Sequence, residues 1–396
     1  MSEQRDIEWV MRRKNRRHGL EPIKEVLRLC GSPQDHLKTV HIAGTNGKGS
    51  TVSYLRSLLT AAGYRTGTFT SPHLVHHCDR IRIDNEWIPE TVFLDYLKQD
   101  MPYIEQYDLG MFEIDTLIAL QWFRDQKADI ILMETGLGGR LDNTNVFQSV
   151  LLNIITTISY DHTDVLGSRI QQIAFEKAGI IQPGSRCLIG PLDPHAETVI
   201  RRTAERKHAA VIKVRKYRSL ADHEFAYKGV KYSFRGAQYQ KQNASLALEA
   251  AWLLGIDISS ETSRRAIAEN SWAGRFEKAG EDPLIIIDGA HNEEGMEALC
   301  RSLQTLPHPV TAVFSALADK PAEKMARRLK SCCDHLILTH FDNARSDRTA
   351  LKMAGAETIP DWREAVETAR GRNEGTVIIT GSLYFISLVR EYLLGK

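Results

Sequence analysis

A glycine-rich segment of the chain carries the residue types that bind nucleotide phosphates. Residues 44–51 read GTNGKGST, which combines glycines, one lysine and several hydroxyl side chains. An apolar run precedes the segment, and apolar side chains follow it at helical spacing as far as Gly63. A glycine-rich turn between a strand and a helix exposes backbone N–H groups at the positive end of the helix dipole, where a lysine can reach the outer phosphates. The segment therefore predicts a phosphate-binding loop with Lys48 as its cation.

This loop departs from the general GxxxxGK[ST] pattern of phosphate loops. Ile42 occupies the position of the first glycine, and Gly49 separates the lysine from the next hydroxyl. A glycine-rich surface turn is the alternative interpretation, but a strand, a lysine, hydroxyl groups and a helix coincide here. Ser50 is the hydroxyl that we expect nearest a metal ion, and Thr51 is its alternative.

Two further apolar runs end in polar side chains. Residues 129–133 lead into Glu134 and a second glycine-rich string, and residues 150–159 precede Asp161 and His162. Open α/β sheets place their ligand crevice at such C-terminal strand ends. We expect Glu134 to be placed where a carboxylate can hold Mg²⁺, although a solvated strand-end carboxylate is the alternative. Residue type alone would make His162 a structural histidine, because Mg²⁺ prefers oxygen ligands.

The elements that must position these residues form an α/β pattern in two parts. After about residue 282, strand-like runs alternate with helix-compatible segments, as in a second, smaller parallel sheet with right-handed crossovers. These runs cover residues 284–287, 310–314, 335–339 and 376–380. We place a domain boundary near residue 280, in a polar segment (277–283) that suits a linker, which gives domains over residues 1–280 and 281–396. Residues 227–234 predict a small β-hairpin.

Charge and length narrow the class of protein. The chain has 396 residues, and 51 Lys and Arg against 50 Asp and Glu leave a net charge of +1. Proteins that bind nucleic acid usually have a clear excess of Lys and Arg over Asp and Glu, so we expect no nucleic-acid partner. The length exceeds what one hydrophobic core normally reaches, which favours two domains.

The cysteine spacing and the apolar stretches argue against disulfide-rich, zinc-binding and membrane-spanning proteins. The cysteines show neither CxxC spacing nor a histidine at zinc-finger spacing, so we expect no disulfide framework and no structural zinc. They are Cys30, Cys78, Cys187, Cys300, Cys332 and Cys333. No stretch stays apolar over the roughly 18 residues that a membrane span needs. We therefore expect a cytoplasmic protein without a membrane partner. We also expect a monomer.

The string HIAGTNGKGST resembles the variant phosphate loop of the folylpolyglutamate synthase and dihydrofolate synthase family, the folate branch of the Mur ligase superfamily. Other strings of that family's kind follow in order over almost the whole chain. They are FTSPHL at 69–74, ETGLGGR at 134–140, DH at 161–162, EKAGI at 176–180, WAGRFE at 272–277, DGAHN at 288–292, DK at 319–320 and TGSL at 380–383. The resemblance implies an α/β fold, in which a P-loop ATPase domain with a parallel-rich central sheet precedes a smaller Rossmann-like α/β domain.

The resemblance also implies an ATP-dependent ligase. Members of the family phosphorylate a carboxylate with ATP, and the amino group of L-glutamate then attacks the acyl phosphate to form an amide. The acceptor would be a tetrahydrofolate polyglutamate, dihydropteroate, or both. Two other hypotheses stay open: a Mur-type ligase with a non-folate acceptor, and a P-loop nucleotide switch without ligase activity.

Residue roles follow from the same resemblance. The implied ATP contacts are Asn46, Gly47, Lys48, Gly49, Ser50, Thr51, Asn243, Arg275 and Asp288. Ser71, Glu134 and His162 are the implied magnesium ligands; two Mg²⁺ ions are expected, and a monovalent cation such as K⁺ is left open. Catalysis is assigned to Lys48, His162 and Lys177. Sequence alone makes Lys177 a surface lysine near a helix end, whereas the matching superfamily lysine is often carbamylated by CO₂.

The two substrates of the ligase reaction are assigned less directly. Phe112 and Glu113 are expected on the folate side, together with the loop after Ser71, and core packing is the alternative role for Phe112. Asp142 is expected to bind substrate. His291 and Ser382 are expected to bind the incoming glutamate. Tyr239 stands where the family's HQxxN string has its histidine, so the role of that histidine is open in this chain.

Overall fold

Tertiary contacts divide the chain into two units. The computed structural model describes residues 3–14, 19–343, 345, 352–372 and 374–395. Unit 1 comprises residues 1–217, 227–232 and 242–268, and unit 2 comprises residues 218–226, 233–241 and 269–396. The predicted single boundary near residue 280 lies inside the last segment of unit 2.

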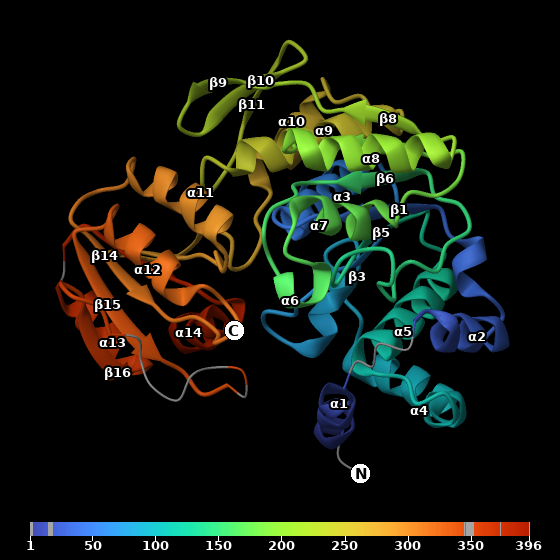
Figure 1. Ribbon diagram of the computed structural model, residues 1–396, viewed down its shortest axis with the longest axis horizontal. Helices are drawn as coiled ribbons and strands as arrows, with labels where there is room; N and C mark the ends of the chain where they lie inside the picture. Colours follow the sequence, from blue (N-terminus) through green and yellow to red (C-terminus); the bar gives the residue numbers. More distant parts are fainter. Residues whose placement is uncertain (1–2, 15–18, 344, 346–351, 373, 396) are drawn as a thin grey trace. The chain divides into compact units, whose positions relative to one another are not determined.

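Unit 1 is built on an eight-stranded sheet (Figure 1). Across the sheet its strands are β4 (Glu86–Trp87), β3 (Ile81–Ile83), β2 (Thr66–Phe69), β5 (Ile130–Glu134), β1 (Thr39–Ala43), β6 (Leu152–Ile155), β7 (Arg186–Ile189) and β8 (Ala210–Lys213). Neighbours from β2 to β8 are parallel, whereas β3 pairs antiparallel with both β2 and β4. Strands β1 and β5 are buried along their whole length, and β5 has the nearly continuous apolar sequence that is typical of a strand buried on both faces. The predicted parallel-rich α/β fold is confirmed.

Helices cover this sheet and complete two hydrophobic cores. They are α1 (Glu3–Arg12), α2 (Glu21–Leu29), α3 (Lys48–Ala61), α4 (Glu90–Gln106), α5 (Met111–Asp125), α6 (Thr163–Leu166), α7 (Ile170–Ala178) and α8 (Pro194–Arg206), with the 3₁₀ turns η1 (Pro33–His36) and η2 (His77–Arg80). Ile131 and Met133 alternate along β5 and pack in one core with α2, α4 and α5. A second core joins β6 and β7 to α7 and α8. Helices α9 (Gln240–Leu253) and α10 (Glu261–Glu269) follow later in the chain.

A small separate sheet contains the predicted hairpin. Its strands lie in the order β11 (Val230–Ser233), β10 (Glu224–Tyr227) and β9 (Arg218–Ala221). Lys228 and Gly229 join β10 to β11 with φ angles of 47° and 82°. Two positive φ angles are typical of the tight turns that match the twist of a β-hairpin. The hairpin predicted over residues 227–234 is therefore confirmed.

Unit 2 has a six-stranded sheet of its own. Its strands lie in the order β12 (Glu277–Glu281), β13 (Leu284–Ile287), β17 (Thr376–Thr380), β14 (Val310–Phe314), β15 (His335–His340) and β16 (Glu357–Asp361). The remaining elements are α11 (Glu293–Leu303), α12 (Ala322–Lys330), α13 (Trp362–Gly371) and α14 (Leu383–Leu394). All neighbours are parallel except β12, which pairs antiparallel with β13.

The linker predicted over residues 277–283 is wrong, because β12 and its turn into β13 occupy that segment. Its polar composition suits an edge strand, which pairs on one side only, and Glu277 accepts from Arg390 of α14 at 3.0 Å. Polar sequence by itself does not distinguish such a strand from a linker.

The cysteine spacing predicted no disulfide framework, and the described residues contain one disulfide, which that spacing did not indicate. Cys300 on α11 and Cys332, just after α12, form a disulfide, with their Cα atoms 5.8 Å apart. The two residues are 32 positions apart in sequence, and no spacing rule links them. Only the packing of α11 against α12 brings them together.

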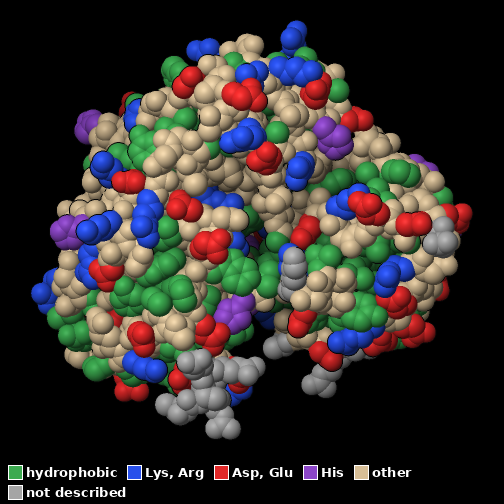
Figure 2. Space-filling view, turned by 180° about the vertical axis from the view of Figure 1, so that it is seen from behind, with side chains coloured by type: hydrophobic (Ala, Val, Ile, Leu, Met, Phe, Trp, Pro, Cys, Tyr) green, Lys and Arg blue, Asp and Glu red, His purple; other side chains and the backbone are tan. Residues whose placement is uncertain are grey.

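None of the helices in the described residues combines the length and the apolar character that a membrane span needs. On the face seen in Figure 2, Lys and Arg side chains lie interspersed with Asp and Glu side chains. The near balance of charge in the sequence therefore extends to the arrangement of charges on that face.

Candidate functional site

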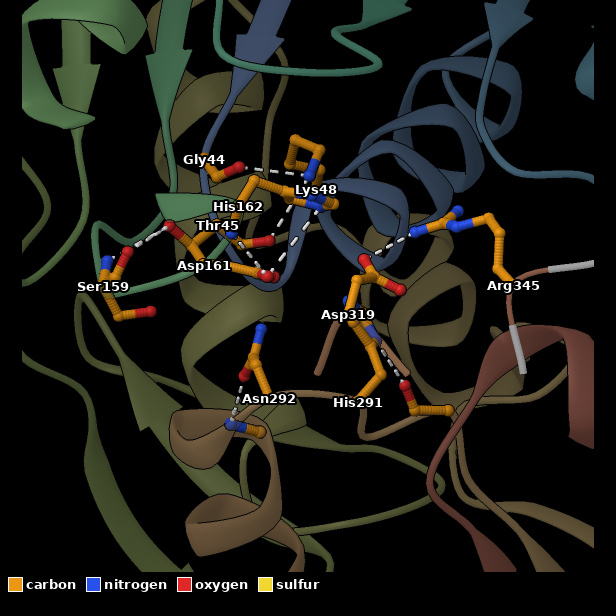
Figure 3. A network of polar contacts seen from close by, with 12 residues as sticks. Gly44, Thr45, Lys48, Ser159, Asp161, His162, His291, Asn292, Asp319 and Arg345 are labelled. Carbon is orange, nitrogen blue, oxygen red and sulfur yellow. Dashed lines mark hydrogen bonds and ion pairs between the residues drawn. The ribbon is translucent and has the colours of Figure 1, made fainter. Parts of the chain in front are cut away.

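The predicted phosphate loop lies between β1 and α3. Lys48 is the first residue of α3, and its Nζ atom donates to the carbonyl oxygens of Gly44, at 3.1 Å, and Thr45, at 3.3 Å (Figure 3). None of its hydrogen bonds within the described chain goes to a carboxylate. The ammonium group is thus placed at the positive end of a helix without a bound counter-charge, as an anion site requires.

The segment that follows β6 holds the loop in shape. The N–H of Thr45 donates to the Thr157 carbonyl at 2.8 Å, and the N–H of Asn46 donates to the Thr157 hydroxyl at 3.1 Å. The Thr156 hydroxyl donates to the Asn46 carbonyl at 2.6 Å. Because β1 and β6 are parallel neighbours, the two segments leave the sheet side by side. One of the amides expected to cradle phosphate, that of Asn46, is therefore engaged within the protein.

Two glycines of the loop are required by close approaches. A Cβ atom on Gly44 would lie 1.8 Å from the Thr156 hydroxyl oxygen. Gly47 has a φ angle of 82°, and a Cβ atom there would lie 2.4 Å from Oδ1 of Asn243. Asn243 lies in the first turn of α9, nearly 200 residues further along the chain. The structure therefore brings this predicted ATP contact to the phosphate loop.

Glu134 and Ser71 meet at the end of the sheet. Strands β2 and β5 are parallel neighbours, so the residues that follow them leave at the same edge. The backbone N–H of Ser71 donates to Oε2 of Glu134 at 3.3 Å, and Glu134 is buried. A buried carboxylate beside a serine is a donor set that suits Mg²⁺, which prefers oxygen ligands and keeps several waters.

His162 occupies an unusual backbone position. It lies directly before α6 with a φ angle of 50°, in the left-handed region that is sparsely populated by residues other than glycine. Its N–H donates to Oδ1 of Asp161 at 2.9 Å, and its Nε2 lies 3.8 Å from the same oxygen (Figure 3). Among the described residues, no three His, Cys, Asp or Glu side chains group as a metal site. Magnesium here would therefore also need the Ser71 hydroxyl, phosphate or water oxygens.

Lys177 is buried, so its interpretation as a surface lysine is wrong. It is 4% exposed, and its Nζ donates to the Gly44 carbonyl at 2.9 Å, the same oxygen that Lys48 contacts. Burial, followed by the nearby charge of Lys48, lowers the pKa of Lys177 from its usual 10.5 to about 7. Asp161 and Asp142 oppose this shift only in part. The amine can therefore be neutral near physiological pH.

Asp142 organises the loop that follows β5. Its carboxylate accepts from the N–H of Leu137 at 2.7 Å, and from the N–H and hydroxyl of Thr144 at 3.1 and 2.5 Å. The Thr144 hydroxyl also bonds Nε2 of His41 on β1 at 2.9 Å. Burial raises the pKa of Asp142 despite these donors. The carboxylate is engaged inside the protein, and its contact with a substrate stays a prediction.

The two residues expected on the folate side, Phe112 and Glu113, lie at the start of α5. Phe112 belongs to the main core of unit 1, and its ring centroid lies 5.3 Å from that of Phe69. The Glu113 carboxylate accepts the N–H of Gly110 at 2.8 Å and thereby caps the helix. Both side chains are buried, with 7% and 4% exposed, so both have structural roles. Their contacts with a pterin stay predictions.

In unit 2 the predicted residues gather where β13 and β17 end. Asp288 follows β13 and is buried, and burial raises its pKa while Tyr239 and Arg275 act in the opposite direction. His291 contacts the Gly289 carbonyl through Nδ1 at 2.8 Å. Ser382 precedes α14, and its buried hydroxyl has no hydrogen-bond partner among the described residues. Because β13 and β17 are parallel neighbours, these residues belong to one edge of the sheet.

Several contacts of the site were not predicted from sequence. Thr156 and Thr157 hold the phosphate loop, and Thr144 links Asp142 to β1. In unit 2, Asp319 pairs with Arg345 at 2.6 Å (Figure 3). The string DK at 319–320 marks one partner of this ion pair, but no signal marks the other.

Comparisons with known proteins agree with this geometry. The Mur ligase middle domain matches residues 42–251, and the Mur ligase glutamate ligase domain matches residues 274–383. A dihydrofolate synthase/folylpolyglutamate synthase of Bacillus subtilis is 37% identical, and the match covers 95% of each chain. The Escherichia coli protein of the same name is 30% identical over 95% of this chain and 91% of its own.

Solved structures show the same fold. Mycobacterium tuberculosis folylpolyglutamate synthase, complexed with ADP and AMPPCP, has a TM-score of 0.88 at 28% identity and covers 99% of both chains. E. coli FolC, in complex with DHPP and ADP, has a TM-score of 0.89 at 28% identity and covers 99% of this chain and 97% of its own. The chain belongs to the Mur ligase family, in the branch of the folylpolyglutamate and dihydrofolate synthases.

Proposed function

We propose that this protein is an ATP-dependent ligase that forms an amide between a folate-type carboxylate and L-glutamate. The observation that carries the proposal is the convergence of Lys48 and the buried Lys177 on the Gly44 carbonyl of the phosphate loop. Relatives with high coverage are named dihydrofolate synthase/folylpolyglutamate synthase, the C-terminal part matches a glutamate ligase domain, and a related structure holds ADP and AMPPCP.

The reaction needs activation of a carboxylate. A carboxylate is a poor electrophile, so its oxygen first takes the γ-phosphoryl group of ATP, which releases ADP and leaves an acyl phosphate. The amine of glutamate then attacks the acyl carbon, phosphate departs, and the amine loses a proton. Phosphoryl transfer depends on positioning and charge neutralisation. Lys48 and the loop from Asn46 to Thr51 would supply these, with Asn243 beside the loop and Arg275 and Asp288 of unit 2 as further ATP contacts.

Ser71, Glu134 and His162 would hold magnesium. The bound ion would neutralise charge on the transferring phosphate oxygens. A buried carboxylate that already accepts the Ser71 amide supports this assignment. A second Mg²⁺ ion is a further expectation from the family resemblance, and a monovalent cation such as K⁺ stays an open question.

Lys177 would be carbamylated. The neutral amine attacks CO₂, an N–C bond forms, and one proton is released, which leaves a carbamate anion in place of a cation. A pKa of about 7 supports this step, because a substantial fraction of the amine is then free at neutral pH. The resulting carboxylate would help to hold the second metal ion, and short carboxylic acids would partly rescue a Lys177→Ala variant.

The two organic substrates would bind at different strand ends. Phe112 and Glu113 would contribute to the folate side, and His291 and Ser382 to the glutamate side. Asp142 would bind substrate. The unpartnered, buried hydroxyl of Ser382 supports the second assignment, because such a group gains from a polar ligand.

Mass-spectrometric product analysis tests the proposed function. Dihydropteroate and tetrahydrofolate are offered separately, each with ATP, Mg²⁺ and glutamate, and we expect a product heavier by one glutamyl residue from at least one of them. Activity with UDP-muramyl acceptors alone would favour the non-folate ligase. ATP hydrolysis without amide formation would favour a nucleotide switch. The monomeric state, the cytoplasmic location and the lack of nucleic-acid and membrane partners stay predictions.

A further inference from the structure

Tyr239 departs from the family string and contacts a predicted ATP ligand. It directly precedes α9 and is partly buried. Its hydroxyl donates to Oδ2 of Asp288, which lies at the end of β13. Both residues belong to unit 2, but 48 other residues separate them along the chain, so only the tertiary structure brings them together.

The two oxygens of Asp288 are used unequally. Oδ2 accepts the Tyr239 hydroxyl and also the N–H of Phe276, at 2.9 Å. Among the described residues, Oδ1 accepts one hydrogen bond, from the N–H of Ala290, at 2.9 Å. An ionised carboxylate offers about two acceptor sites on each oxygen. Oδ2 is therefore saturated, and Oδ1 has room for one further donor.

The phenol also determines how firmly the carboxylate is held. The bonds from Phe276 and Ala290 come from backbone N–H groups, and the Tyr239 hydroxyl is the one side-chain donor to Asp288 within the described chain. A charge-assisted O–H···O bond is among the stronger hydrogen bonds in proteins. Its loss would let the carboxylate rotate and exchange its two oxygens.

We propose that Tyr239 is a positioning residue, which holds Asp288 so that Oδ1 accepts a ribose hydroxyl of the nucleotide. The inference rests on the proposed role of Asp288 in binding ATP and adds a residue that determines specificity for the sugar. It also gives a function to the tyrosine that replaces the family's histidine.

The test compares equilibrium binding of ATP with that of 2′-deoxyATP and 3′-deoxyATP. Dissociation constants are measured by calorimetry on the full chain, without folate or glutamate, so that turnover does not contribute. We expect wild-type protein to prefer ATP over one deoxy analogue by about tenfold or more, since a hydrogen bond to a charged group is lost. In Tyr239→Phe this preference should fall to about threefold or less.

Tyr232→Phe is the matched control. The Tyr232 hydroxyl donates to the Ile258 carbonyl at 2.7 Å, so the variant also loses a hydrogen bond of a buried phenol, but not one that Asp288 accepts. We expect it to keep the wild-type preference at a similar unfolding temperature. An unchanged preference in Tyr239→Phe, or an equal loss in both variants, would overturn the inference.

The same measurement separates the two proposals. Wild-type protein that binds ATP and both deoxy analogues equally would overturn the role of Tyr239 but not the ligase function. Wild-type protein that binds no ATP would overturn the proposed function, and the role of Tyr239 with it.

Discussion

Replacing Lys177 with methionine should stabilise the protein at neutral pH. In the folded chain the pKa of Lys177 is about 7 against a usual value of 10.5, so the folded state binds fewer protons than the unfolded state between these values. The free energy of unfolding therefore rises with pH across this window and is lowered as pH falls towards 7. Each pKa unit corresponds to about 1.4 kcal/mol.

The size of the effect follows from that window. At pH 7.5 the buried amine lowers the free energy of unfolding by about 4 kcal/mol relative to a side chain that does not titrate. At pH 9.5 it lowers this free energy by about 1.4 kcal/mol. Methionine removes this cost but also the bond to the Gly44 carbonyl, which contributes about 1 kcal/mol. Lys177→Met should therefore be more stable than the wild type by roughly 3 kcal/mol at pH 7.5 and nearly equal to it at pH 9.5.

Urea unfolding in CO₂-depleted buffer, followed by tryptophan fluorescence at both pH values, measures this difference. CO₂ is removed because carbamylation would change the charge of the lysine. Lys213→Met is the control, because the Lys213 side chain is half exposed and pairs with Glu197 at 2.6 Å. Its effect should be small at both pH values. Equal stability of Lys177→Met and wild type at pH 7.5, or a difference that does not shrink at pH 9.5, would refute the argument from burial.

Other substitutions test the remaining parts of the site. Lys48→Ala should lower kcat by at least about a hundredfold, because charge stabilisation of phosphoryl transfer is lost. Steady-state assays at saturating ATP measure this kcat, and a smaller decrease would contradict the role of Lys48. Gly47→Ala should weaken ADP binding in calorimetry, because the new Cβ would lie 2.4 Å from Oδ1 of Asn243. Gly63→Ala is the control: its φ angle of 91° gives a similar backbone cost, but no atom lies within 4 Å of the new Cβ. This control variant should bind ADP as the wild type does. Asp115→Asn should cost about 3–5 kcal/mol in urea unfolding, because the buried Asp115 carboxylate lies 3.6 Å from the buried guanidinium group of Arg80, which would lose its counter-charge. A loss below about 1 kcal/mol would contradict this buried ion pair.

Local patterns in the sequence predicted most of the elements near the site. The apolar runs at 284–287, 310–314 and 376–380 coincide with β13, β14 and β17. The phosphate loop joins β1 to α3, and Gly63 follows the end of that helix with a positive φ angle. These features depend on backbone geometry and on side-chain periodicity over a few residues, which the sequence displays directly. The polar edge strand β12 was missed, because an edge strand and a linker share one composition.

By itself, the sequence determined the phosphate loop, the α/β class and the position of Glu134 at the end of a strand. The strand expected over residues 150–159 is shorter, since β6 ends at Ile155 and His162 lies directly before α6. The tertiary structure decided which charges are buried and what they contact. From sequence alone Lys177 is interpreted as a surface lysine. In the folded chain its amine, on α7, is buried and donates to the Gly44 carbonyl. The hydroxyl of Tyr239 likewise finds Asp288 only in the folded chain. A pKa or a hydrogen bond depends on desolvation and on atoms far apart in sequence, so no local pattern records it.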